Sequence, residues 1–183
     1  ASGALGGIRM VMAEYPQDGL DVLGSAPEQV PWRLDRDKAG DTFCLGDIGT
    51  HIENLASYVT GLSVTRLQAR LASFTGHDLD DDARVVLEYE GGAEGIYWAS
   101  KVAPGCENSL KLRVYGTEAS VEWEQETPNR MILRRTGGAA PQVITRGRGD
   151  ASPRSRKAAR LPLGHPEGYY ESFANLYREV FDY

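Results

Sequence analysis

The sequence predicts an α+β domain in which helices cover one face of an open, mostly antiparallel β-sheet. Between residues 65 and 135, apolar and polar side chains alternate with a period of two in successive short segments. The turns between these segments are too short for the crossovers that parallel strands need. Helical spacing of apolar residues occurs before this region, at 47–60, and after it, at 165–180.

The strands follow one another with little between them. Residues 6–16 indicate a first strand, closed by Pro16, and Gly91-Gly92 is typical of a tight turn. The later strands are expected at 65–74, 83–90, 94–102, 109–116 and 119–125, with a further one at 130–135. The polar face of this sheet is expected to be either solvated or a subunit interface; it carries Arg66, Arg70, Lys111, Arg113, Glu122 and Glu124.

The best helix of the first half begins near Asp47, a possible N-cap, and ends before Gly61. Its apolar positions have helical spacing: Ile48, Ile52, Leu55, Ala56 and Val59. Residues 17–46 before it have no clear period, and irregular segments of that length are usually functional. A second helix is expected near Pro166, with an apolar stripe at Tyr169, Phe173, Leu176 and Val180.

Length and composition describe one globular domain, residues 1–183. The net charge of -6 argues against nucleic acid or anionic membranes as partners, and no apolar run is long enough to span a bilayer. Two cysteines make no disulfide framework, which favours a reducing, cytoplasmic location. Both termini suggest a piece cut from a longer protein.

Two charged runs have simple interpretations. Residues 146–160 contain six basic side chains among Gly, Ser and Pro, which favours a mobile surface loop over an anion-binding segment because no aromatics are interleaved. The acidic run around His77 lacks the glycine and spacing of a calcium loop, and we expect a solvated turn there.

Asp47 and His51 are the strongest candidates for chemistry. On a helix, residues four apart share a face within hydrogen-bonding reach. A carboxylate beside an imidazole fixes its tautomer and makes it a better proton acceptor near neutral pH, as a general base for an alcohol requires. The alternative is purely structural: Asp47 caps the helix and His51 is a half-buried neighbour.

Other catalytic chemistries find little support. His51 and His165 are far apart in sequence and lack a compact ligand motif, so no metal site is predicted. The sequence also lacks a glycine-rich phosphate fingerprint after a strand, a P-loop and a G-x-S-x-G elbow.

The segments AEYPQDG, WRLDRDKAG, LGDIGTHIENLASYVTG and GHPEGYYESFANLY, together with the run of strands, resemble the C-terminal domain of the Gfo/Idh/MocA family, whose members are NAD(P)-dependent sugar and inositol dehydrogenases. The resemblance covers nearly the whole chain, and the D-x-x-x-H helix is its most specific element. It implies that NAD or NADP is bound mainly by an N-terminal Rossmann domain, which is absent from these residues together with its catalytic lysine.

The resemblance also implies roles for individual residues. His51 would be the base that takes the hydroxyl proton, and Asp47 its orienting partner and a ligand of a substrate hydroxyl. Arg33, Lys101 and His165 would contact a sugar or polyol, and the open sheet would form a homo-oligomer.

Two functions follow as expectations. The first is the substrate-binding and catalytic domain of an NAD(P)-dependent sugar or polyol oxidoreductase, inactive as an isolated fragment. The second is a non-catalytic carbohydrate-binding or oligomerisation module.

Overall fold

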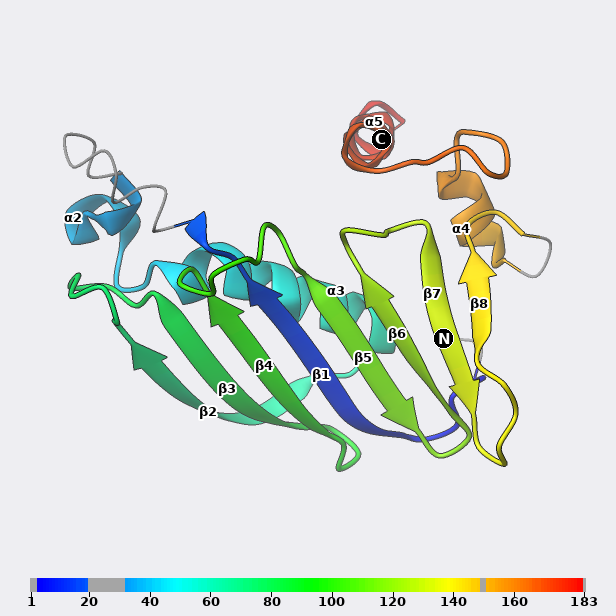
Figure 1. Ribbon diagram of the computed structural model, residues 1–183, viewed down its shortest axis with the longest axis horizontal. Coiled ribbons are helices and arrows are strands. Elements are labelled where there is room, and N and C mark those ends of the chain that lie inside the picture. Colours follow the sequence, from blue (N-terminus) through cyan, green and yellow to red (C-terminus); the bar gives the residue numbers. More distant parts are fainter. Residues whose placement is uncertain (1–2, 20–31, 149–150, 183) are drawn as a thin grey trace.

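The computed structural model describes residues 3–19, 32–148 and 151–182, which contain one eight-stranded sheet in the order β2-β3-β4-β1-β5-β6-β7-β8 (Figure 1). The strands are β1 (Ile8–Pro16), β2 (Val64–Ala72), β3 (Asp82–Tyr89), β4 (Glu94–Ser100), β5 (Lys111–Gly116), β6 (Ala119–Glu124), β7 (Arg130–Arg135) and β8 (Gln142–Thr145). The expected open sheet is therefore confirmed, with β8 as a strand that the sequence did not predict.

The first strand lies in the middle of the sheet. It pairs in parallel with β4, where Val11 lies beside Gly95, and antiparallel with β5, where Val11 lies beside Val114. The other neighbouring strands pair antiparallel, as their short connections predict. The parallel pair places the carboxyl ends of β1 and β4 side by side, and this edge holds the candidate site.

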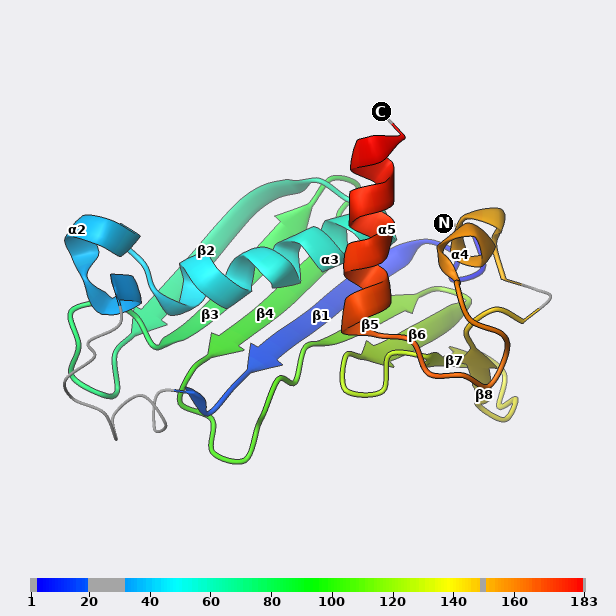
Figure 2. The same ribbon diagram turned by 90° about the horizontal axis from the view of Figure 1, so that it is seen from above.

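Helix α3 (Thr50–Thr60) crosses one face of the sheet (Figure 2). Its side chains Ile52 and Ala56 are fully buried and belong to the same core cluster as Val11 and Val114. Burial of a large aliphatic side chain of this kind contributes about 1.5–3 kcal/mol. The helix ends at Gly61, whose φ of 71° is the left-handed conformation that glycine adopts without strain.

The start of this helix differs from the prediction. A π-helical turn, η2 (Leu45–Gly49), precedes α3, and Asp47 lies inside it, so Asp47 is not the N-cap. The carboxylate of Asp80 instead accepts hydrogen bonds from the N–H groups of Phe43 (2.7 Å) and Leu45 (2.8 Å). An acid distant in sequence therefore satisfies the free amides of the first turn, and the carboxylate of Asp47 is left for another partner.

The acidic run is not the solvated turn that we expected. His77 and Asp78 are exposed, but Asp80, Asp81 and Asp82 are all buried. The carboxylate of Asp81 accepts from the N–H groups of Phe74 and Thr75 and from the Thr75 hydroxyl. The carboxylate of Asp82 accepts from Trp98 Nε1 (2.9 Å) and Arg84 Nε (2.7 Å). Three consecutive acids are stable here because each is matched with its own donors.

Asp81→Asn is expected to lower the free energy of unfolding by about 2 kcal/mol. The NH2 group of the asparagine would face the N–H and O–H donors that now bond to the carboxylate, at a site that is 1% exposed. Urea unfolding followed by circular dichroism measures the change. Asp78→Asn, an exposed acid of the same run, is the matched control and is expected to shift stability by less than about 0.5 kcal/mol. Equal midpoints for the two variants would contradict this account.

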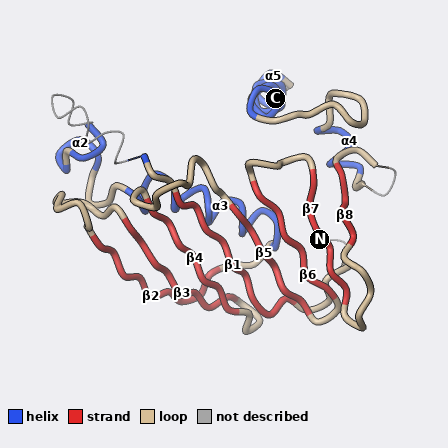
Figure 3. The backbone as a smooth tube through the Cα atoms, viewed as in Figure 1, coloured by secondary structure: helices blue, strands red, loops and turns tan. Residues whose placement is uncertain are grey.

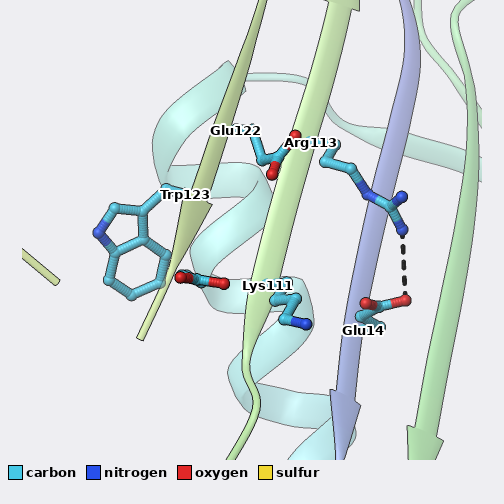
Figure 4. A pocket seen from close by; sticks show the side chains of 6 residues that line it. Glu14, Lys111, Arg113, Glu122 and Trp123 are labelled. Atoms are coloured by element: carbon cyan, nitrogen blue, oxygen red, sulfur yellow. Dashed lines mark hydrogen bonds and ion pairs between the residues drawn. The ribbon is translucent and has the colours of Figure 1, made fainter. Parts of the chain in front are cut away.

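The face of the sheet opposite α3 is open. Its ion pairs join neighbouring strands: Arg66 with Glu88, Arg113 with Glu14 (3.3 Å), and Arg134 with Glu122 (3.0 Å). Figure 4 shows a shallow hollow on this face, with the Arg113–Glu14 pair at one side; it is lined by Glu14, Lys111, Arg113, Glu122, Trp123 and Glu124. Edge strand β2 is exposed on both faces, so the alternation around Leu67 (59% exposed) does not mark core positions there.

Short helices occupy segments that were expected to be irregular. The 3₁₀ turn η1 (Trp32–Leu34) and helix α2 (Arg36–Ala39) lie in the 17–46 segment, whose residues 20–31 are outside the described part. Helix α4 (Pro153–Ala158) lies in the basic run at 146–160, which is therefore not simply a loop; residues 149–150 of that run are not described. The Ser152 hydroxyl caps α4 by accepting from the Ser155 N–H (3.1 Å).

The last helix, α5 (Tyr169–Phe181), begins three residues after Pro166 and stands away from the sheet (Figures 2 and 3). The carboxylate of Glu171 accepts from the Gly168 N–H (2.8 Å) at its first turn. Its apolar stripe has the predicted helical spacing, but no residue of α5 is buried within the described chain.

Candidate active site

The candidate site lies where the carboxyl ends of β1 and β4 meet the start of α3. Asp47 comes from η2, His51 from the first turn of α3, and Lys101 follows directly after β4. The backbone N–H of Lys101 donates to the Asp81 carbonyl (2.8 Å), and Asp80 holds the start of the helix. The buried acidic run thus fixes the two chain segments that carry Asp47 and Lys101.

Lys101 and Asp47 form an ion pair. The ammonium nitrogen of Lys101 donates to Asp47 Oδ2 (2.7 Å) and to Gln17 Oε1 (2.6 Å). Lys101 is only 9% exposed, and its ammonium also lies 5.6 Å from the centre of the Phe43 ring. A buried ammonium must be compensated, and Asp47 supplies the charge while Gln17 supplies a second acceptor.

His51 is exposed and faces an aromatic ring. The edge-to-face contact with Tyr15 has ring centres 6.0 Å apart and an angle of 74° between the planes. In the described part of the chain, the imidazole has no hydrogen-bond partner, and the carboxylate of Asp47 is bonded to Lys101. The spacing of Asp47 and His51 predicted a hydrogen bond between them; in the described residues Asp47 bonds to Lys101 and the ring of His51 contacts Tyr15 instead.

A second layer of polar groups supports Lys101 and Tyr15. The Tyr15 hydroxyl donates to Asn108 Oδ1 (2.5 Å), and Gln17 Nε2 donates to the same oxygen (2.7 Å). Sequence reasoning missed Tyr15, Gln17 and Asn108. Gln17 directly follows β1, so the parallel pairing of β1 with β4 could have placed it near Lys101, but that pairing joins strands far apart in sequence.

The other two predicted substrate contacts, Arg33 and His165, have other partners in the described residues. Arg33 is exposed in η1 and stacks on Trp32, with 5.0 Å from its guanidinium carbon to the ring centre. His165 is exposed in the segment before α5, where its carbonyl accepts from Arg146 Nη2 (2.8 Å). Between described residues, neither side chain makes a hydrogen bond to Asp47, His51 or Lys101.

Two buried tyrosines connect α3 to the sheet just beyond His51. The Tyr97 hydroxyl donates to Glu53 Oε2 (2.9 Å), and the Tyr89 and Tyr97 hydroxyl oxygens are 2.6 Å apart. Burial raises the pKa of both phenols, so they remain neutral hydrogen-bonding groups. This connection fixes the rotation of α3 and therefore the direction in which its exposed face points.

Metal ligation and a thiolate at Cys44 are not supported in the described residues. Within 3–19, 32–148 and 151–182, no cluster of three His, Cys, Asp or Glu residues could hold a metal ion. Burial raises the pKa of the Cys44 thiol, so Cys44 is not a reactive thiolate. None of the helices in the described residues is long and apolar enough to cross a membrane.

The described residues also do not fit a dinucleotide. Such a site needs a glycine-rich turn between a strand and the start of a helix. Gly91 and Gly92 join β3 to β4, with no helix between them. In the part that the structure describes, the site can bind hydroxyl groups and accept a proton, but it holds no recognisable pyrophosphate cradle.

Comparisons with known proteins identify the family and the fold of the chain. The family model described as the GFO/IDH/MocA C-terminal domain matches residues 1–122. An uncharacterized oxidoreductase, YfiI of Bacillus subtilis, is 31% identical over 183 residues, covering 96% of this chain and 46% of that protein.

Two solved structures are also similar. An inositol dehydrogenase homolog from Azotobacter vinelandii, complexed with NAD+, is 37% identical with a TM-score of 0.90; the match covers 96% of this chain and 46% of that one. Its complex with NADH and myo-inositol is 36% identical with a TM-score of 0.86, over 96% of this chain and 45% of that one. The chain thus spans about half the length of these relatives.

Proposed function

Since this chain belongs to the Gfo/Idh/MocA family of oxidoreductases and corresponds to the C-terminal domain of its members, we propose that it is the substrate-binding and catalytic domain of an NAD(P)-dependent sugar or polyol oxidoreductase. The observation that carries the proposal is the Lys101–Asp47 ion pair, together with an exposed imidazole, His51, four residues after Asp47 on the continuous helical segment of η2 and α3. The myo-inositol complex of the Azotobacter vinelandii relative supports a polyol as the substrate class.

The site has the groups that a neutral polyol needs. A substrate hydroxyl both donates and accepts hydrogen bonds, so it can bridge the Asp47 carboxylate and the Lys101 ammonium. The ion pair has no net charge, which suits a neutral sugar better than a sugar acid. Arg33 and His165 are proposed as further substrate contacts, which would bind other hydroxyls of the sugar.

His51 is proposed as the general base. Oxidation of an alcohol to a carbonyl releases the hydroxyl proton, and an exposed imidazole beside the substrate hydroxyl can accept it. A bound nicotinamide would supply the hydride acceptor for this oxidation. We assign its binding to an N-terminal Rossmann domain of the complete protein, because the described residues here do not fit a dinucleotide.

The proposal is tested with the complete protein. It is incubated with NAD or NADP and a panel of neutral polyols and sugars that includes myo-inositol, and the absorbance of the reduced nicotinamide is followed. We expect at least one neutral polyol to support turnover, and sugar acids of matched size to support less. Turnover with acids alone, or with no compound of the panel, would contradict the proposal.

The second candidate is a carbohydrate-binding or oligomerisation module without catalytic activity. The exposed open face of the sheet is the feature that favours it. The two functions differ in a direct binding measurement: a module binds sugar equally well with and without the cofactor half, and its complete protein reduces no nicotinamide. A catalytic domain gains affinity when the cofactor is bound.

We also propose that the open face forms a homo-oligomer. Val86 (55% exposed) lies beside Ile96 (42% exposed) in the register of β3 and β4, and the cross-strand ion pairs flank these apolar positions. Paired charges cost less to bury at an interface than single ones. Exposed apolar residues flanked by paired charges therefore favour a subunit interface over a solvated surface for the open face of the sheet.

Val86→Glu with Ile96→Glu is expected to lower the apparent mass of the complete protein in analytical ultracentrifugation, because two unpaired like charges replace apolar contacts. Val59→Glu changes an exposed apolar residue of α3 (38% exposed), on the other side of the sheet, and serves as the control. A monomeric wild type, or an unchanged mass in the double variant, would contradict the proposed interface.

A further inference from the structure

We propose that Gln17 and Asn108 are positioning residues of the active site, which hold the ammonium of Lys101 in the direction from which it meets the substrate. This inference rests on the proposed function. It assigns a role to two residues outside the Asp47, His51 and Lys101 cluster.

The orientation of the Asn108 side chain is set by two donors. Its Oδ1 accepts from two donors, the Tyr15 hydroxyl at 2.5 Å and Gln17 Nε2 at 2.7 Å. A carbonyl oxygen has two lone pairs, so both are used. With the oxygen held in this way, the amide of Asn108 has a single favourable orientation.

The orientation of the Gln17 side chain is set in turn by Asn108. Because its Nε2 donates to Asn108, its Oε1 must face the other way, where it accepts from Lys101 Nζ at 2.6 Å. The Gln17 backbone is held separately: its N–H donates to the Ser100 carbonyl (2.8 Å) and its carbonyl accepts from the Ala103 N–H (3.0 Å). The side chain can therefore be changed without releasing the chain.

The ammonium of Lys101 is fixed in direction by two acceptors. Lys101 has three N–H donors; one goes to Asp47 and one to Gln17, which leaves one direction for a ligand. Asp47 alone would let the flexible lysine swing about a single contact, whereas two acceptors fix the third direction. The network reaches the other side of the site through Tyr15, whose ring faces His51.

The backbone of the loop that carries Asn108 is held by contacts that do not involve the Asn108 side-chain amide. The Asn108 N–H donates to Glu126 Oε1 (3.0 Å), and the Ser109 hydroxyl donates to the same oxygen (3.1 Å). Glu126→Ala therefore removes these two bonds and none of the side-chain hydrogen bonds among Tyr15, Gln17, Asn108 and Lys101. It is the matched control for a loss of stability without a loss of positioning.

The kinetic test uses the complete enzyme with a polyol that supports turnover. Asn108→Leu and Gln17→Met are expected to raise KM about 10-fold or more and to lower kcat less, because a displaced ammonium weakens substrate binding. Asn108→Asp keeps acceptor oxygens for Tyr15 and Gln17, and its KM is expected to stay within about threefold of wild type. Glu126→Ala is expected to leave KM within about twofold.

A second readout needs no activity. Lys101 is acetylated with acetic anhydride in the same proteins, and the modified peptide is quantified by mass spectrometry. The rate at Lys101 is expected to rise about threefold or more in Asn108→Leu and Gln17→Met, since the ammonium is released from its second acceptor, and to stay at the wild-type value in Glu126→Ala.

These measurements separate the inference from the proposed function. A wild-type enzyme without polyol oxidation refutes the function, and the acetylation rates then decide the positioning role alone. Unchanged KM and unchanged acetylation in Asn108→Leu would overturn the inference. An Asn108→Asp variant as impaired as Asn108→Leu would also overturn it, because the loss of the acceptor oxygen would then not explain the rise in KM.

Discussion

Replacing His51 with alanine in the complete enzyme is expected to lower kcat by about 10²–10⁴, the range found when a general base is removed. The reason is the proton balance of alcohol oxidation: the hydroxyl proton must leave as the carbonyl forms, and we propose the exposed imidazole of His51, four residues after Asp47, as its acceptor. The KM for the polyol is expected to change less than kcat. Steady-state kinetics with saturating cofactor measures both quantities.

His77→Ala provides the control, because His77 is an exposed histidine in the turn before the buried acids. Its kcat is expected to equal the wild-type value. A fall of less than threefold in His51→Ala, with an unchanged circular dichroism spectrum, would rule out His51 as the base.

Asp47→Asn is expected to lower kcat/KM by about 10–100-fold, because hydrogen bonds to charged groups contribute about 1.5–3 kcal/mol. The amide keeps the shape of the side chain but removes the charge that balances the buried ammonium of Lys101. Asp78→Asn makes the same chemical change at an exposed acid outside the site and is expected to have no effect.

A double-mutant cycle shows whether Asp47 acts through Lys101. If the ion pair is the working unit, Asp47→Asn combined with Lys101→Met is about as impaired as Lys101→Met alone. Additive losses would show that Asp47 acts independently, for instance by orienting His51 directly.

The sheet was predictable because its signal is local. The alternation at 83–90, with Val85, Leu87 and Tyr89 inward, needs only neighbouring residues, and all three are buried as expected. Helix α3 was predictable for the same reason, from Ile52 and Ala56 to the terminal Gly61. The central place of β1 was not predictable, because its parallel partner β4 is about eighty residues away.

The candidate site was predictable only in part. The Asp47 and His51 pair stands out by its spacing, but the N-cap interpretation of Asp47 failed because Asp80, from a distant turn, takes that role. The carboxylate of Asp47 could therefore bond to Lys101, a contact between segments 54 residues apart. Gln17 and Asn108 carry no local signal, since only the assembled sheet brings them together.

A crystal structure of the complete enzyme with reduced cofactor and a polyol that supports turnover tests the central claim most directly. The account predicts a ring nitrogen of His51 about 2.6–3.2 Å from the hydroxyl of the reacting carbon, with Lys101 and Asp47 bonded to hydroxyls of the same molecule. A different side chain at that hydroxyl, with His51 turned toward solvent, would contradict it.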